Sequence, residues 1–173
     1  GVIDNTAKPV NISANGSVMN NGTIAGNNIS VNATGNLSNR GDITSAGNVT
    51  VVAGNISNSK DGNITGAGKT AVSTTGNGSI DNAGTIGASG NTTVTGGNIT
   101  NAVGTGVIGN TGTTTNVTAN GSIANNGTIA GSNISVNATG NLSNKGDITS
   151  AGNVTAVFTG DACPGLMCFS FHC

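Results

Sequence analysis

The sequence is poor in the side chains on which most catalytic and nucleic-acid-binding sites depend. Its 173 residues include no Trp, Tyr or Glu, a single His, and only 6% charged residues. Five Lys and Arg residues cannot neutralise a track of phosphates, which argues against nucleic acid as a partner. One His and no Glu leave few groups for acid–base chemistry, so we expect neither an enzyme nor a cofactor. No apolar run approaches the roughly 18 residues of a spanning helix, so no membrane insertion is expected.

Small polar residues are abundant instead, and they are arranged in an internal repeat. A Gly opens each successive unit, at intervals of 19 or 24 residues: Gly16, Gly35, Gly54, Gly78, Gly97, Gly121 and Gly140. Residues 16–53 match residues 121–158 at 32 of 38 positions, which indicates a duplication of several units. Repeats of this length are typical of solenoids, in which each unit packs only against its neighbours.

Each unit carries three apolar positions, which predict three short strands. The first position is occupied by Ile3, Val18, Leu37, Ile56, Ile80, Ile99, Ile123 and Leu142. The second is occupied by Ile24, Ile43, Ile64, Ile86, Ile108, Ile129 and Ile148. The third is an alternating triplet, as in Ile29-x-Val31-x-Ala33, Val49-x-Val51-x-Ala53 and Ile134-x-Val136-x-Ala138, and alternation of period two is the signature of a strand. We therefore predict an all-β fold, a right-handed parallel β-solenoid (β-helix) of about eight coils of about 19 residues, triangular in cross-section.

An Asn follows the first apolar position by two residues in every unit. The series comprises Asn5, Asn20, Asn39, Asn58, Asn82, Asn101, Asn125 and Asn144. Stacked amides can hydrogen-bond from one coil to the next, and Asn tolerates the backbone conformations of turns. We interpret the series as a structural ladder rather than a binding site.

The composition changes after Phe158, which divides the chain into solenoid repeats (1–158) and a short C-terminal cap (159–173). The residues expected to cover the open end of the last coil are Leu166, Met167, Phe169 and Phe171. Cys163, Cys168 and Cys173 predict one disulfide and one remaining thiol that could link two molecules. Disulfide use predicts a secreted, extracellular protein. A metal site is not expected, because His172 adjoins Cys173 and no fourth ligand is suitably spaced.

One motif resembles a phosphate-binding loop. Residues 62–70 end in Gly-Lys-Thr, but Asn63 stands where such a loop requires Gly. No helix is expected after it, so nucleotide binding is not predicted.

A second motif is a candidate integrin-binding triplet, Arg40-Gly41-Asp42. The duplicated position carries Lys145-Gly146-Asp147. Because both glycines fall at the turn Gly of the repeat, and charged residues there keep the turn soluble, a structural role is favoured over receptor binding.

The pattern Gly-x-Ile-x-Asn-x-Gly-x-Ile, followed by Val-x-Val or Val-x-Ala, is well illustrated by residues 35–43. It resembles the haemagglutinin-type repeats of large two-partner-secreted bacterial adhesins, over about residues 1–158. The resemblance implies a β-solenoid rod that serves as a stalk or an adhesive surface. The amino-terminal secretion module of those adhesins is not found in this sequence, and the Cys- and Phe-containing ending looks like the terminus of a small protein.

The outward positions of the third strand form two columns without a charge, an aromatic ring or a long side chain. The candidate surface-binding residues are Ser30, Asn32, Thr50, Val52, Ser73, Thr93, Thr95, Asn116, Thr118, Ser135, Asn137, Thr155 and Val157. Asn11, Ser13 and Ala71 complete the columns. We expect a flat face whose groups repeat at about 4.8 Å along the rod and about 7 Å along each strand. The second-strand face differs, since it carries Asp42, Asp147 and Asn63 among Thr residues.

Three functions fit this pattern. The uncharged face resembles those of insect and microbial antifreeze solenoids, which makes an ice surface the first candidate partner, although Asn interrupts the Thr ranks. The alternatives are a rod segment of a bacterial adhesin or cell-surface filament, and a structural filament that self-associates end to end or through disulfides. An effect on ice growth would indicate ice binding, and saturable binding to cells or glycans would indicate an adhesin. Rods in electron micrographs would indicate a self-associating filament.

Overall fold

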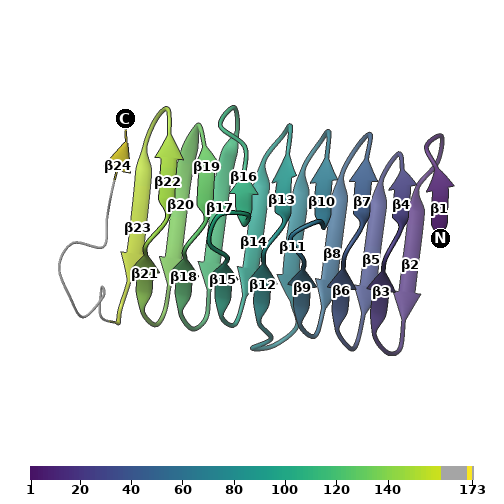
Figure 1. Cartoon of the computed structure of the whole chain (residues 1–173), viewed down its shortest axis with the longest axis horizontal. Coiled ribbons are helices and arrows are strands. Elements are labelled where there is room, and N and C mark those ends of the chain that lie inside the picture. Colours follow the sequence, from purple (N-terminus) through teal and green to yellow (C-terminus); the bar gives the residue numbers. More distant parts are fainter. Residues whose placement is uncertain (161–170, 173) are drawn as a thin grey trace.

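The computed structural model describes residues 1–160 and 171–172, which form a parallel β-solenoid of about eight coils, as the sequence predicts. The chain winds from one end of the rod to the other, so that the first and last strands lie at opposite ends (Figure 1). Three parallel sheets run along the rod, and every strand pairs with the equivalent strand of the next coil. The fold is therefore built almost entirely from contacts between successive coils.

The strands of each sheet recur at every third element. Sheet A contains β1 (Val2–Asn5), β4 (Thr23–Gly26), β7 (Asp42–Ser45), β10 (Asn63–Gly66), β13 (Thr85–Ala88), β16 (Val107–Gly109), β19 (Thr128–Gly131), β22 (Asp147–Ser150) and β24 (Phe171–His172). Sheet B contains β2 (Val10–Ala14), β5 (Ile29–Ala33), β8 (Val49–Ala53), β11 (Thr70–Thr74), β14 (Thr92–Gly96), β17 (Thr114–Ala119), β20 (Asn133–Ala138) and β23 (Val154–Phe158). Sheet C contains β3 (Val18–Asn20), β6 (Leu37–Asn39), β9 (Ile56–Asn58), β12 (Ile80–Asn82), β15 (Ile99–Asn101), β18 (Ile123–Asn125) and β21 (Leu142–Asn144).

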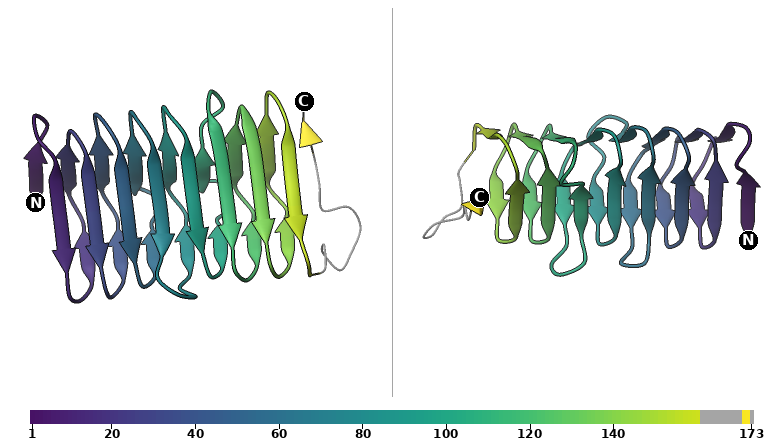
Figure 2. Two further views of the ribbon diagram at one scale, coloured as in Figure 1. Left: turned by 180° about the vertical axis from the view of Figure 1, so that it is seen from behind. Right: turned by 90° about the horizontal axis from the view of Figure 1, so that it is seen from above.

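The three sheets surround a narrow aliphatic core, and the two further views of the ribbon show the strands stacked along the rod (Figure 2). Each sheet contributes one face of alternating side chains, and the inward residues Val31, Val51 and Val136 are fully buried. The Ile residues of sheet A and the Ile and Leu residues of sheet C complete this core along the rod. The predicted inward direction of the third strand is thus confirmed, and its other face is left to solvent.

Two coils are longer than the others, and the additional residues lie at corners between sheets. The segment 59–62 enlarges the corner between β9 and β10, and the segment 102–106 enlarges the corner between β15 and β16. A third enlarged corner, residues 75–79, joins β11 to β12. The strand register continues across these coils, so the 24-residue intervals do not interrupt the rod.

The prediction for the first coil is wrong in one respect. Ile3 and Asn5 lie in β1 of sheet A, where Ile3 pairs with Ile24 and Asn5 with Gly26. They therefore do not belong to the sheet C column or to the Asn series. Only residues 6–9 separate β1 from β2, which is too short a segment for a further strand and two corners.

One inward row of sheet B is polar in the middle of the rod. Thr70, Thr92 and Thr115 occupy the position that is aliphatic in the other coils, and all three side chains are buried. The Thr115 hydroxyl donates to the carbonyl of Ala130 at 2.7 Å, whereas the hydroxyls of Thr70 and Thr92 have no hydrogen-bond partner in the described part of the chain. The aliphatic periodicity of the sequence does not predict this polar row.

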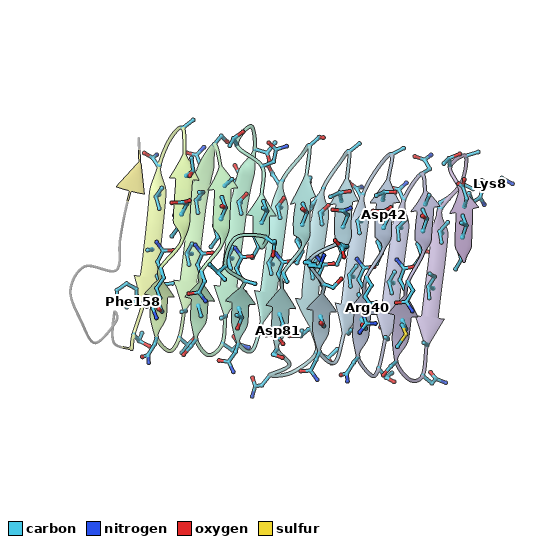
Figure 3. The ribbon with its side chains drawn as sticks, in the orientation of Figure 1. Lys8, Arg40, Asp42, Asp81 and Phe158 are labelled. Carbon is cyan, nitrogen blue, oxygen red and sulfur yellow. The ribbon has the colours of Figure 1, made fainter. Side chains whose placement is uncertain are left out.

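At the C-terminal end, Phe158 packs in part against the core as the last residue of β23 (Figure 3). β24 extends sheet A by pairing with β22, so the backbone at Phe171 covers one strand edge of the last coil. The other residues expected in the cap, Leu166, Met167 and Phe169, lie outside the described residues, as do all three Cys residues.

Candidate functional site

A continuous ladder of Asn side chains runs inside the corner that follows sheet C. The side-chain amide of each member donates to the Oδ1 of the next, from Asn20 to Asn144, at distances between 2.7 and 2.9 Å. The same amides also donate to backbone carbonyls, as Asn82 does to the carbonyls of Gly84 and Val107. All seven side chains are buried, so the ladder holds the corner together and offers no surface for a ligand.

The outer face of sheet B is the surface that the sequence singles out. Strand pairing places the predicted residues in two straight columns, for example Thr93 beside Asn116 and Thr95 beside Thr118. The columns continue without a slip from Asn11 and Ser13 to Thr155 and Val157. None of these residues is charged, and all are half-buried or exposed. The structure therefore brings all the predicted surface residues together on one face.

This face is chemically mixed along each column. One column passes through Asn, Ser, Thr and Ala, and the other through Ser, Asn, Val and Thr. Neither column of the described face therefore repeats a single side-chain type from coil to coil, although the spacing of the strands is regular. Such a surface can make hydrogen bonds and small apolar contacts, but it cannot attract a charged ligand over a distance.

The outer face of sheet A has a different chemistry. Asp42, Asn63 and Thr85 lie side by side in register, and the side-chain amide of Asn63 donates to a carboxylate oxygen of Asp42 at 2.7 Å. Asp147 occupies the same column further along the rod, beside Thr128. The prediction that Asp42, Asn63 and Asp147 lie on the second-strand face is confirmed.

A shallow groove of about 530 Å³ lies on this face, and sequence reasoning missed it. Its floor includes Gly87 and Ala130, in a column where the neighbouring coils carry Thr44 and Thr65. The Gly positions of this column lack a side chain and Ala130 has only a methyl group, so the surface is low over adjacent strands, and turn residues such as Thr111 stand at its border. The replacement of Thr by Gly in this column is the sequence signal that could have located the groove.

The Arg40-Gly41-Asp42 triplet lies at a regular corner of the rod rather than on a projecting loop (Figure 3). Gly41 is required there, because a Cβ would collide with the backbone of Gly22 in the preceding coil. Asp42 begins β7, and its carboxylate accepts the Asn63 bond. These contacts agree with the structural interpretation of the motif, and receptor binding stays the less favoured alternative.

The described residues hold no group of three or more His, Cys, Asp or Glu side chains that could bind a metal ion. The segment 62–70 forms β10 and the corner before β11, with no helix after it in the described chain. In that same part of the protein, no helix has the length and apolar character needed to span a membrane.

Comparison with known proteins gives one match. The family model described as haemagglutinin repeat aligns with residues 4–77, 44–127 and 110–157. These overlapping ranges together cover nearly all of the solenoid, including the groove and both outer faces. Neither the curated proteins nor the solved structures gave a match.

Proposed function

The chain belongs to the haemagglutinin repeat family, and from this we propose that it is a rod segment of a secreted bacterial surface adhesin. The observation that carries the proposal is the unbroken register of the coils over the whole range matched by the family. Eight coils at about 4.8 Å per coil give a stiff spacer about 38 Å long. A rod of this kind holds adhesive surfaces away from the cell that displays it.

Sheet A provides the better contact surface for such an adhesin. It combines the groove with hydroxyl groups and with the Asp42 and Asp147 carboxylates, so it can satisfy both polar and apolar parts of a ligand. The predicted residues of sheet B carry no charge, and none of them lines this groove. We therefore assign recognition to sheet A and the spacer role to the rod as a whole.

The test is saturable binding of the labelled chain to host cells and to immobilised glycans. Thr65→Arg places a long side chain at the groove, and we expect it to weaken binding at least tenfold. Thr118→Arg is the matched control on sheet B, since it makes the same change at another half-buried outward Thr. Asp42→Ala tests the triplet separately. Absence of saturable binding by the unmodified chain would contradict an adhesive role.

Ice binding is a second candidate, favoured by the uncharged, in-register outer face of sheet B. The family match supports it less than the adhesin rod, and the mixed columns weaken it further. It predicts thermal hysteresis and shaped crystals in a nanolitre osmometer, lost on Thr93→Tyr or Thr118→Tyr and retained on Asp42→Tyr. Normal ice growth in the presence of the unmodified chain would exclude it.

A further inference from the structure

Within the described residues, sheet B alone has no charged residue in any of its strands. Asp42 and Asp147 lie in strands of sheet A, and Asp81 lies in β12 of sheet C. Lys8 and Lys69 fall in the corner segments before β2 and β11, at the border of sheet B rather than on it. Another surface can therefore approach the outer face of sheet B without bringing like charges together.

The outer face of sheet B is also continuous along the described rod. Its strands lie side by side (Figure 1). The enlarged corners 59–62 and 102–106 join sheet C to sheet A, and this corner of the rod lies opposite sheet B. Val52 and Val157 stand in one outward column with Thr118, and Val157 is 51% exposed. Hydrocarbon groups are thus presented beside hydroxyl groups on a face that neither corner covers.

The area of this face suffices for a dimer. Its eight strands, at about 4.8 Å per strand, give a length of about 38 Å, and five residues at about 3.3 Å give a width of about 16 Å. Two such faces in contact bury about 1,200 Å² in total, at the lower end of specific, stable interfaces. Because the face has no aromatic or Arg anchor, we expect a weak dimer with a dissociation constant of about 10–100 µM.

A second copy of the same face is the occupant that this chemistry fits. Two-fold dimers use the same patch on both subunits, so the patch must complement itself. Ser and Thr hydroxyls and Asn amides each donate and accept hydrogen bonds, so they can bond to the same groups of another copy. Short side chains of this kind also interdigitate between facing sheets about 10 Å apart. A face that carries carboxylates, such as sheet A with Asp42 and Asp147, lacks this self-complementarity.

We propose that the outer face of sheet B is the interface of a homodimer. The sheet B faces of two copies pack on each other about a two-fold axis that lies in the plane of the interface. The Ser, Thr, Asn and Val side chains of the two copies interdigitate and exclude most of the water between them. Sheet A and its groove stay exposed in both copies, and the inference does not depend on the proposed adhesive role.

Sedimentation equilibrium of the full chain, at concentrations below and above this dissociation constant, should show a monomer–dimer equilibrium. A reductant is present, because the sequence contains three Cys residues. Two double variants, Thr95→Lys with Thr118→Lys and Thr95→Asp with Thr118→Asp, place two like charges side by side in one column. Each alone should dimerise at least about tenfold more weakly, because like charges then meet across the interface. An equimolar mixture of the two should form heterodimers at least as tightly as the unmodified chain.

The matched control is Ser38→Lys with Ser57→Lys, which adds the same charges to neighbouring outward positions of sheet C. It should leave the dissociation constant within about threefold, since exposed charges beyond the interface are screened by salt. Circular dichroism checks that each variant keeps its strands. If a double variant unfolds, the single substitutions Thr118→Lys and Thr118→Asp make the same test.

Monomers of the unmodified chain at every concentration would overturn the proposal. So would a dimer that the sheet C pair weakens as much as the sheet B pair, or a Lys and Asp mixture that stays monomeric. Monomers that shape ice crystals would assign the face to ice and overturn it as well. A dimer seen only without the reductant would be disulfide-linked, which also contradicts a sheet B interface.

Discussion

The side-chain amide of Asn58 donates a 2.8 Å hydrogen bond to Oδ1 of Asn82, although 24 residues separate the two. The same bond joins Asn39 to Asn58, also at 2.8 Å, across 19 residues. The extra five residues (24 minus 19) therefore leave the stacking of sheet C unchanged and are taken up at the corners. The ladder sets the register of the rod, and the corners absorb variation in length.

We expect Asn82→Ala to lower the free energy of unfolding by about 3 kcal/mol or more. The side chain is 1% exposed, and its amide bonds Asn101, Gly84 and Val107, so the substitution leaves several buried groups without partners. Urea denaturation measures the effect. The control is Asn77→Ala in the exposed corner 75–79, which should change stability by less than about 0.5 kcal/mol. Equal effects of the two substitutions would show that the ladder contributes little.

Much of this fold could be predicted because aliphatic side chains recur at fixed positions in every coil. Ile43, Ile64 and Ile86 are each separated from the next strand by the same kind of corner, so their common column follows from spacing. Ile3 was misplaced because its pattern with Asn5 imitates a sheet C strand, and only the shortness of residues 6–9 distinguishes it. The groove was missed because it results from absent side chains, which hydrophobic periodicity does not register.

The buried Thr row allows a comparison of two substitutions at equivalent positions. Thr92→Val replaces an unpartnered buried hydroxyl with a methyl group of similar size, and should raise stability by about 1 kcal/mol. Thr115→Val removes the hydrogen bond to the Ala130 carbonyl and should be neutral or destabilising, by up to about 1.5 kcal/mol. Thermal unfolding of both variants in parallel tests this. A loss of stability in Thr92→Val would indicate that its hydroxyl has a partner after all.

Deletion of residues 103–105 should leave the rod intact. The remaining sequence Asn101-Ala102-Gly106-Val107 then has the spacing of Asn82-Ala83-Gly84-Thr85, in whose corner the Gly carbonyl accepts the same bond from the Asn side chain. Val103 is 77% exposed, so little apolar contact is lost. We expect the free energy of unfolding to change by less than about 1 kcal/mol, since short surface segments contribute little to stability. A large loss of stability on chemical denaturation would show that the corner supports the coils beside it.

Gly109→Ala should be among the most destabilising single-methyl changes in the chain. Gly109 has φ of +91°, a conformation that L side chains rarely adopt, and a Cβ there would collide with the Ala130 carbonyl and the Thr115 hydroxyl. The new methyl group would thus compete for the space of the hydrogen bond that joins those two residues. We expect a loss of about 3 kcal/mol or more in the free energy of unfolding, with increased amide hydrogen exchange in β17 and β19. Gly16→Ala, where a Cβ meets nothing within 4 Å, is the control and should be nearly neutral. If Gly109→Ala and Gly16→Ala unfold at the same urea concentration, a methyl group is tolerated beside the Thr115–Ala130 hydrogen bond. Position 109 would then not require glycine.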